Sequence, residues 1–308
     1  MQIRINDECL GIERPDADVV YISHAHADHV IRTDKDILAS SETFRLIQRE
    51  RSKNRKSGVK EPKHRPEMQS VELFPSGHML GSTQIRMHNG KTIVYTGDFK
   101  LRDGFTVKAA PILQCDELIV DATFGNPAFK FPSRDAVKDS IINWINEKPE
   151  DNVIFGAYRM GKSQELIKLL NTAGIKPLVT PPIETVCKAY EELGMDLQRV
   201  VMGSEDSENV LNSNDRFVAI FPFNKVNGDL ELEMSEVYGK TSCAVVTGWC
   251  LTRQFSVKAF PLSDHAGFEE ILEYAEGSGA KKVICRFGEA SRLVDALRRR
   301  GINSKWMP

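Results

Sequence analysis

Short apolar runs rich in valine and isoleucine recur along the chain and predict β-strands. They lie at 19–23 (VVYIS), 92–97 (TIVYTG), 117–122 (ELIVDA), 152–158 (NVIFGAY), 176–180 (KPLVT), 217–223 (FVAIFPF), 243–249 (CAVVTGW) and 281–287 (KKVICRF). Amphipathic patterns at 133–147, 162–174, 183–194 and 291–301 predict helices. Ser133 is a suitable N-cap, and Gly174, Gly194 and Gly301 suit helix ends. This alternation predicts an α/β fold with at least some parallel sheet.

The size and composition of the chain predict a folded protein of two domains. Its 308 residues exceed one average domain, and 41% of them are hydrophobic, enough to bury a sizeable core. No run approaches the roughly 18 apolar residues that span a bilayer, and the first residues lack the apolar middle of a signal peptide. The six cysteines form no C-x-x-C pair, which argues against a disulfide framework or a zinc finger. We therefore expect a cytoplasmic protein with no membrane partner.

Positive charge is concentrated in one segment, although the formal net charge is only −2. Residues 45–65 carry nine lysines and arginines against two glutamates. Two interpretations stay open, a solvated loop and a local handle for a nucleic-acid phosphate backbone.

The densest chemistry follows the strand at 19–23, where the segment HAHADH occupies residues 24–29. His24, His26, Asp28 and His29 are separated only by alanines, and they include three of the chain's seven histidines. Imidazole and carboxylate ligands suit a zinc-like ion, and small alanine side chains allow several ligands to converge. A polar loop with solvent-facing histidines is the alternative, and this density argues against it.

Two later residues are candidates to complete the ligand set. His78 lies between Gly77 and Gly81, in a turn that could present an imidazole to a metal. Asp98 follows the strand at 92–97, where α/β proteins place their sites. Taken alone, the first could be a turn histidine and the second a capping residue. In chain order after H-x-H-x-D-H, they no longer look independent.

The segment GAYRMGKS, residues 156–163, fits the nucleotide-binding pattern G-x-x-x-x-G-K-S between a predicted strand and a predicted helix. Its interior positions Ala157, Tyr158, Arg159 and Met160 are not glycines, so the backbone would wrap a phosphate poorly. The acidic strand that ends at Asp121 also precedes this loop. ATP binding is therefore disfavoured, and the segment is interpreted as a helix start whose N–H groups favour anions.

The order HAHADH, GHMLGS and TGD resembles the metallo-β-lactamase superfamily, and later motifs narrow the resemblance to its β-CASP nucleases. These motifs are LIVDATFG, GAYRMGKSQEL, VVTGWC and LSDHAGF. The similarity runs nearly from end to end. SGHMLGSTQI, DATFGNPAF, TGWC and LSDHA look most like the compact DNA exonucleases associated with DNA ligase, which are relatives of Artemis and of the messenger-RNA 3′-end-processing nucleases.

The resemblance implies a metallo-β-lactamase αββα sandwich formed by residues 1–131 and 256–308, with a compact β-CASP α/β domain, residues 132–255, inserted between them. It implies a metal-dependent nuclease, a 5′-to-3′ exonuclease on DNA, in which a metal-activated hydroxide attacks the phosphate in the cleft between the domains. One or two Zn²⁺ ions are the implied cofactors, with Mn²⁺ or Mg²⁺ as alternatives at the second site. DNA is implied ahead of RNA as the partner, and a functional link to a DNA ligase or helicase follows by resemblance only.

The resemblance also implies two metal positions and the residues around them. The implied ligands are His24, His26 and His78 for the first ion, Asp28 and His29 for the second, and Asp98 bridging both. His265 would steady the phosphate or protonate the leaving oxygen, so that Asp28, Asp98 and His265 are the implied catalytic residues. Asp121 would orient a histidine ligand, with strand capping as its alternative role.

The implied substrate-binding residues lie in two motifs. They are Arg159, Lys162, Ser163 and Ser263. A nucleic-acid phosphate would meet the turn that carries the first three of them. For Lys162, the alternative is that it only begins a helix.

Two departures from the family pattern bear on the metal site. The family usually places an aspartate before the histidine loop, where this chain offers Glu13 or Asp16, and we favour Glu13. RNA-processing members have a histidine in a strand-end HGE, where this chain has Phe287. Phenylalanine cannot bind zinc, so the second metal should be weaker, absent, or held mainly by Asp28, His29 and Asp98. Animal DNA-processing relatives also lack that histidine, which favours DNA modestly, because bacterial ligase-associated relatives retain it.

Three other classes of function compete with a DNA nuclease. An RNA-processing endonuclease or exonuclease of the same branch is the nearest. A thioesterase or lactonase of the superfamily would lack the inserted domain and the LSDHA element. A nucleotide-binding protein or a structural zinc protein is the third, but a structural zinc site is closed by four ligands, whereas six candidates here predict an open, catalytic arrangement.

Overall fold

The computed structural model describes residues 1–52, 62–213, 215–288 and 290–307. The chain forms two compact units. Unit 1 comprises Met1–Asp103, Val107–Lys130 and His265–Pro308, and unit 2 comprises Gly104–Thr106 and Phe131–Asp264. Residues 53–61, the centre of the basic segment singled out in the sequence, lie outside the described residues.

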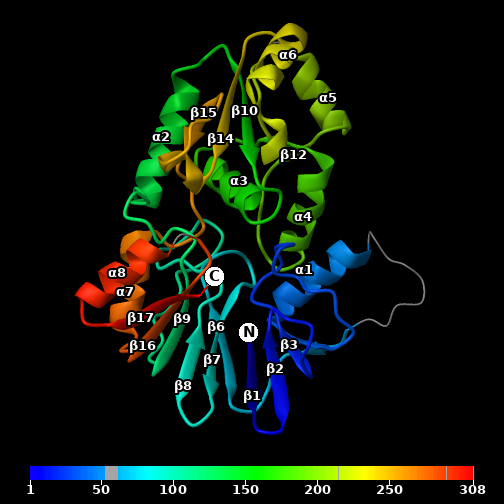
Figure 1. Ribbon diagram of the computed structural model, residues 1–308. Coiled ribbons are helices and arrows are strands. Elements are labelled where there is room, and N and C mark those ends of the chain that lie inside the picture. Colours follow the sequence, from blue (N-terminus) through cyan, green and yellow to red (C-terminus); the bar gives the residue numbers. More distant parts are fainter. Residues whose placement is uncertain (53–61, 214, 289, 308) are drawn as a thin grey trace. The chain divides into compact units, whose positions relative to one another are not determined.

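Unit 1 contains two sheets (Figure 1). Sheet A consists, in spatial order, of β1 (Gln2–Ile5), β2 (Glu8–Ile12), β3 (Val19–Tyr21), β4 (Asp36–Leu38) and β5 (His64–Arg65). Sheet B consists of β17 (Asn303–Met307), β16 (Lys282–Arg286), β9 (Glu117–Asp121), β8 (Thr92–Tyr95), β7 (Thr83–His88) and β6 (Val71–Pro75). Because β16 pairs with β9, the last part of the chain completes a sheet that its first part begins.

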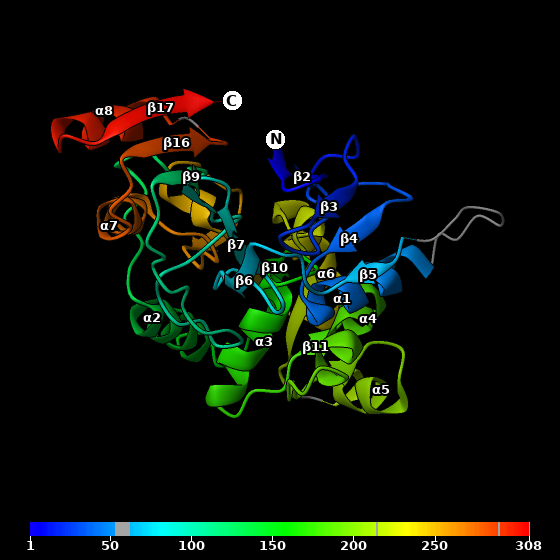
Figure 2. The same ribbon diagram turned by 90° about the horizontal axis from the view of Figure 1, so that it is seen from below.

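The two sheets of unit 1 pack face to face around one hydrophobic cluster. Tyr21 and Leu10 of sheet A contact Ile85 and Tyr95 of sheet B within it, and all are fully buried. The other face of sheet B packs against α7 (Phe268–Gly277) and α8 (Ser291–Arg299), and Figure 2 shows both helices on that side. On sheet A, α1 (Ser41–Ser52) stacks Phe44 on His64 of β5. Unit 1 is therefore layered helix, sheet, sheet, helix.

Unit 2 is built on one parallel sheet, sheet C. Its strands are, in spatial order, β12 (Val200–Val201), β11 (Leu178–Val179), β13 (Val218–Pro222), β10 (Asn152–Ala157), β14 (Thr241–Val246) and β15 (Lys258–Phe260). Every residue of β10 is buried, as expected for a parallel strand covered on both faces. The connecting helices are α2 (Arg134–Asn146), α3 (Lys162–Thr172), α4 (Pro181–Glu191), α5 (Glu205–Asn212), α6 (Gly228–Tyr238) and the short 3₁₀ helices η1 (Phe223–Lys225) and η2 (Gly248–Leu251).

The α/β class expected from the sequence is confirmed, and each predicted strand and helix has a counterpart in the structure. Ser133 caps α2, since its side chain accepts a hydrogen bond from the amide of Ala136. The sequence did not indicate α1 or α5, nor the two-residue strands β5 and β12, which are too short to carry a readable period. It also assigned residues from 256 onward to the first domain, whereas Lys258 pairs with Ala244, which places β15 in sheet C.

Among the described residues, no helix combines the length and the apolar character needed to cross a membrane.

Candidate metal centre

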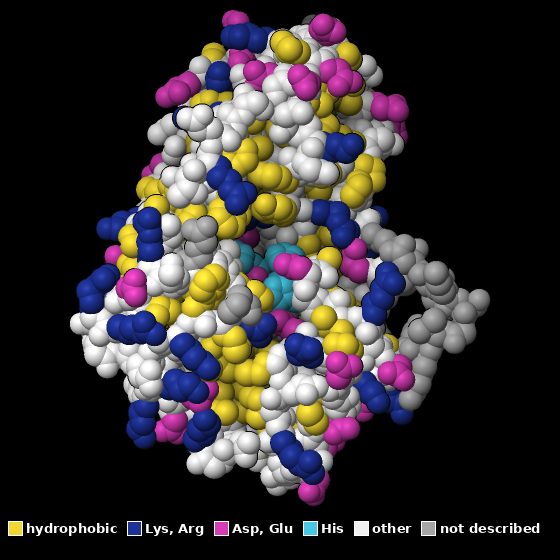
Figure 3. Space-filling view, in the orientation of Figure 1, with side chains coloured by type: hydrophobic (Ala, Val, Ile, Leu, Met, Phe, Trp, Pro, Cys, Tyr) yellow, Lys and Arg dark blue, Asp and Glu magenta, His cyan; other side chains and the backbone are white. Residues whose placement is uncertain are grey.

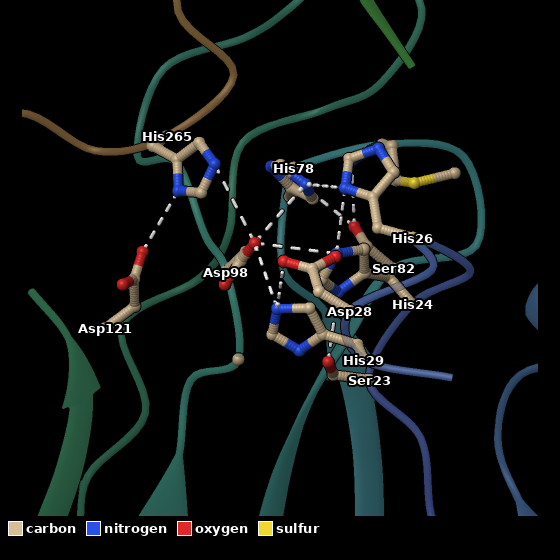
Figure 4. A network of polar contacts seen from close by, with 12 residues as sticks. Ser23, His24, His26, Asp28, His29, His78, Ser82, Asp98, Asp121 and His265 are labelled. Atoms are coloured by element: carbon tan, nitrogen blue, oxygen red, sulfur yellow. Dashed lines mark hydrogen bonds and ion pairs between the residues drawn. The ribbon is translucent and has the colours of Figure 1, made fainter. Parts of the chain in front are cut away.

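Three histidines of unit 1 point their ring nitrogens at one another (Figure 4). His24 and His26 come from the loop after the buried strand β3, and His78 comes from the loop between β6 and β7. His24 Nε2 lies 3.0 Å from His26 Nδ1, and His78 Nε2 lies 3.2 Å from the same atom. Zinc–nitrogen bonds of about 2.0–2.1 Å imply a tetrahedral edge of about 3.3 Å, so this spacing fits three ligands of one ion.

Asp98 lies at the centre of the site. Its Oδ2 is 3.5 Å from His24 Nε2, and 3.6 Å from both His78 Nε2 and His29 Nε2. His265 Nε2 is 3.7 Å from the same oxygen. One carboxylate oxygen therefore faces four imidazoles, which is the position expected of a group that bridges two ions.

Burial raises the pKa of Asp98 to about 7, against the opposing charge of His265. Burial likewise lowers the pKa of His24 well below its usual value, and the neighbouring histidines lower it further. At neutral pH, His24 is therefore a neutral imidazole, the form that binds a metal. Among the described residues, two overlapping groups have the geometry to hold an ion: His24, His26, His78 and Asp98, and then Asp98, Asp121 and His265.

Glycines of the surrounding loops allow the ligands to approach. Gly77 has φ +74°, and a Cβ there would lie 2.5 Å from the carbonyl oxygen of Lys100. Gly97, with φ +55°, would place a Cβ 2.8 Å from that of Ser23. Both positions combine a left-handed backbone with a close approach, which only glycine accommodates. His78 and Asp98 are the residues that follow these two glycines.

Glu13 links two of the histidines from behind. Its Oε1 accepts hydrogen bonds from Ser23 Oγ at 2.5 Å and from His29 Nδ1 at 2.8 Å. Ser23 Oγ in turn lies 3.0 Å from His24 Nδ1. Because Nδ1 of each histidine is engaged in this way, Nε2 of each is left to face Asp98. Tyr95, whose hydroxyl donates to Glu13 at 3.1 Å, completes the arrangement.

Burial tends to lower the pKa of His29, but its hydrogen bond to Glu13 and the charges of Asp98 and Asp28 outweigh burial and raise the pKa to about 10. Burial tends to raise the pKa of Glu13, and the hydrogen bond and charge of His29 overcome it and lower that pKa. The two groups therefore stabilise each other as a buried ion pair. Asp28, by contrast, is 82% exposed and lies 3.8 Å from His29 Nε2.

His265 is held by Asp121 on the side away from Asp98. Its Nδ1 lies 3.1 Å from Asp121 Oδ2, while Asp121 Oδ1 accepts hydrogen bonds from the amide and hydroxyl of Thr123. The side chain of His265 is 23% exposed. Figure 3 shows histidine side chains reaching the surface together beside acidic ones, so a solute can reach the site.

Phe287 borders this site without offering a ligand. Its ring lies 5.9 Å from that of His29, and its φ is +62°, an uncommon value for a bulky residue. The next residue, Gly288, would place a Cβ 2.4 Å from the carbonyl oxygen of Ala122, so the chain turns tightly here.

The residues predicted to bind substrate lie in unit 2, and two of them support the turn that carries them. Ser163 is buried, and its amide and hydroxyl both donate to the carbonyl of Tyr158, at 3.0 and 2.8 Å. Gln164 accepts from the amide of Gly161 at 2.8 Å and donates to the carbonyl of Arg159 at 3.1 Å. The amides of this helix start thus have partners inside the chain, which corrects the expectation of N–H groups open to an anion.

Lys162 is buried and paired with Asp264, with 2.7 Å between Nζ and Oδ2. Arg134 lies 3.5 Å from the other carboxylate oxygen of Asp264 and 2.9 Å from Glu165. Glu165 accepts from the amides of Phe105 and Thr106, which ties Gly104–Thr106 to unit 2. Lys162 therefore neutralises an internal carboxylate, and direct phosphate contact by Lys162 or Ser163 stays a prediction. Arg159 is half-buried, and Ser263 is buried.

The sequence did not identify several residues whose part is to position another side chain. Ser23 ends the predicted strand at 19–23, and Tyr95 lies within the predicted strand at 92–97. Both strands are ordinary apolar runs, so nothing in the sequence pattern distinguished these two residues. Arg134 begins an amphipathic helix and reads as a surface residue. Ser23 could have been found from its position, since it directly precedes His24.

A search with models of known protein families finds no match. The chain is similar to a probable DNA ligase of Opitutus terrae, with 28% identity over 297 residues, which cover 92% of this chain and 28% of that protein. It is also similar to an uncharacterized protein in the lig 3′ region of Acidianus ambivalens, with 38% identity over 115 residues, covering 35% of this chain and 76% of that protein. A third relative is the DNA cross-link repair protein SNM1 of Arabidopsis thaliana, with 22% identity over 86% of this chain and 60% of that protein.

Among solved structures, the fold resembles a protein of unknown function from Enterococcus faecalis V583, with a TM-score of 0.64 and 12% identity over 97% of this chain and 81% of that one. The chain thus spans about a quarter of the first curated relative and over half of the third. Together with the order of its histidine and aspartate motifs, these relatives show that the chain belongs to the β-CASP branch of the metallo-β-lactamase superfamily.

Proposed function

We propose that the protein is a metal-dependent nuclease, a hydrolase of phosphodiester bonds. The observation that carries this proposal is the single oxygen of Asp98 that faces four imidazoles within 3.5–3.7 Å. A structural zinc site is closed by four ligands, whereas this cluster gathers more candidates and is reached from solvent. We infer a cofactor of one or two ions, with Zn²⁺ as the first choice and Mn²⁺ or Mg²⁺ as alternatives at the second position.

His24, His26, His78 and Asp98 would hold the first ion. For a second ion, Asp98 would be shared with His29 and Asp28, as the family resemblance implies, or with Asp121 and His265, whose ligand atoms lie close to that of Asp98. When bound, such ions supply Lewis acidity for the phosphate and a nucleophile from water at neutral pH. The remaining work falls to side chains of this chain.

His265 is the candidate proton donor. Asp121 engages its Nδ1 and so directs Nε2 toward Asp98 and the reacting phosphate. A protonated histidine can give a proton to the leaving oxygen, or hold the phosphate as a cation. Asp121 is then a positioning residue, and Glu13 has the same part for His29 and, through Ser23, for His24.

DNA is the proposed substrate, with 5′-to-3′ exonuclease action as the finer proposal. Two of the three relatives carry names that refer to DNA ligation or DNA cross-link repair, and Phe287 replaces the histidine of RNA-processing members. A functional link to a DNA ligase is proposed on the same ground. For the fold, we propose that unit 1 is the metallo-β-lactamase domain and unit 2 the inserted β-CASP domain.

The test is digestion of matched DNA and RNA oligonucleotides by protein reconstituted with zinc or manganese. We expect single-stranded DNA to be shortened from its 5′ end, and a blocked 5′ end to protect it. Preferred cleavage of RNA would replace the DNA proposal by an RNA-processing one. Thioester or lactone hydrolysis, with no cleavage of either nucleic acid, would overturn the nuclease proposal.

A further inference from the structure

Aromatic side chains gather at the carboxyl edge of sheet C, on three neighbouring strands. Ala157 of β10 pairs with Pro222 of β13, so the next residues along the chain, Tyr158 and Phe223, lie side by side. Their rings are stacked, with centroids 4.7 Å apart and planes only 11° from parallel. On the other side of β10 lies strand β14, and Trp249 follows that strand at the same edge of the sheet.

The flat geometry of this pair differs from that of buried pairs in the same protein. Tyr21 and Tyr95 meet at 86°, and Phe99 and Tyr274 at 76°, the edge-to-face contact that cores favour. Tyr158 is 45% exposed, although Phe223 covers one face of its ring. The outer face of Tyr158 is therefore open to solvent as a flat surface.

Phe223 belongs to the core beneath, whereas Tyr158 lies outside it. Phe223 and Phe255 pack against the hydrophobic cluster of unit 2, and their rings meet at 86°. Tyr158 is not part of that cluster. Its backbone is nevertheless fixed, because Ser163 donates two hydrogen bonds to its carbonyl. The ring of Tyr158, backed by Phe223, is thus held in place although it contributes little to the core, and we call this pair the aromatic shelf.

Positive charge flanks the aromatic shelf. Lys225, in the short helix that Phe223 begins, is exposed, and Arg159 follows Tyr158 directly. Arg253 is exposed and lies over the ring of Trp249, with 4.2 Å between its guanidinium carbon and the ring centroid. Figure 3 shows hydrophobic side chains exposed on unit 2 with lysine and arginine side chains beside them.

We propose that Tyr158, backed by Phe223, stacks on a base of single-stranded nucleic acid, while Lys225 and Arg253 attract the phosphates beside it. Flat aromatic faces next to cations are the usual means of binding single strands, since every base has a stacking face and every nucleotide a phosphate. A duplex keeps its bases stacked on each other and cannot offer one to the shelf. The proposal deepens and rests on the proposed nuclease function, because it names the form of nucleic acid that the protein selects.

The test measures binding apart from cleavage, by fluorescence anisotropy of a labelled oligothymidine with full-length protein that carries His26→Ala. In this background we expect Tyr158→Ala to weaken binding about tenfold or more, since one base stack is lost. Tyr158→Phe should bind like the parent. Tyr238→Ala is the matched control, because Tyr238 is a 40% exposed tyrosine of the same unit that makes an edge contact with Phe217, and it should also bind like the parent.

Equal affinity of the Tyr158→Ala variant and the parent for the single strand would overturn the proposal, as would an equal loss for a duplex of the same sequence. A second readout uses Tyr158→Trp, whose emission should be quenched by oligothymidine beyond the change seen with the parent; unchanged emission would count against stacking. The two proposals fail separately. Binding that depends on Tyr158, without cleavage by the metal-loaded parent, would refute only the nuclease, whereas cleavage with binding indifferent to Tyr158 would refute only the shelf.

Discussion

At the scale of the residue, Asp98 determines how the site responds to pH. Its carboxyl is buried among the histidines and loops of the site, and burial raises its pKa to about 7. In protein stripped of metal, a raised carboxyl pKa favours the folded state below the ordinary value near 4, and this contribution is lost as pH rises through 7. A bound cation reverses the trend, because it needs the carboxylate.

We therefore expect zinc to raise the melting temperature of the stripped protein more at about pH 8 than at about pH 6. At the lower pH zinc must displace the proton of Asp98, whereas at the higher pH it does not. His29, with a pKa of about 10, keeps its proton at both pH values in the stripped protein, and an ion that binds it must displace that proton, which changes the zinc effect in the same direction. Thermal scans with and without zinc measure the effect, and a larger zinc shift at the lower pH would contradict it.

Glu13 should control metal affinity without touching the metal. Glu13→Gln weakens its hold on His29 and, through Ser23, on His24, and loss of such a partner commonly costs about 10–100-fold in affinity. Competition with a zinc chelator measures this. Asp16→Asn is the matched control, since Asp16 was the alternative in the sequence and is exposed. Equal affinity of both variants would show that Glu13 has no such part.

Phe287 should limit the second ion. Its ring is 5.9 Å from that of His29 and its φ is +62°, a conformation that histidine tolerates better than phenylalanine. Phe287→His should therefore retain more zinc per chain after dialysis, measured by elemental mass spectrometry, than either the parent or Phe287→Leu. If the histidine and leucine variants retain the same amount, the position does not face the second ion.

At the scale of the element, the side chains of the GKSQE segment at the start of α3 connect several loops of unit 2. Four of its consecutive residues are buried, and each holds a different partner: Lys162 holds Asp264, Ser163 holds Tyr158, Gln164 holds Gly161, and Glu165 holds Phe105. The side chains of this segment, which resembles a nucleotide-binding loop in sequence, thus hold the turn before α3, the loop 104–106 and Asp264 in place. The ring of Tyr158, in the turn that this segment holds, is exposed to solvent.

Lys162→Met should destabilise unit 2 by about 3–5 kcal/mol, because it leaves Asp264 buried without its nearest cation. Adding Asp264→Asn should recover part of the loss, since the uncompensated charge is then removed. Urea unfolding measures both variants. A single variant as stable as the parent would show that the pair is not coupled to folding.

The elements also show where sequence reasoning succeeds. Long periodic segments such as 133–147 and buried runs such as 117–122 were predicted, because their own residues decide them. Strands of two residues, such as β5 and β12, form because a neighbouring strand pairs with them, and no local pattern in the sequence indicates them. The helix start at Lys162 was predicted, but the pairing of Lys162 with Asp264 and of Glu165 with Phe105 was not, because these partners lie far away in the sequence.

At the scale of the whole molecule, the metal-site candidates illustrate the same division. Residues 78 and 98 stand far from 24 and 26 in the sequence yet meet them in space, and the order of motifs was enough to group them. The family resemblance implied that Asp121 orients a histidine ligand, but not that its partner is His265. Ser23, Tyr95 and Arg134 act through contacts that only the folded chain displays.

We propose above that the histidine and aspartate cluster of unit 1 hydrolyses phosphodiester bonds with a bound metal. The most direct measurement follows zinc content and cleavage of 5′-labelled single-stranded DNA in the same preparations of the parent, His26→Ala and His88→Ala. His88 lies on β7, and its side chain is 49% exposed, which makes it a histidine outside the cluster. We expect His26→Ala to lose both zinc and cleavage, and His88→Ala to keep both. Cleavage that survives the loss of His26, or zinc-loaded parent that leaves every DNA and RNA intact, would contradict this proposal.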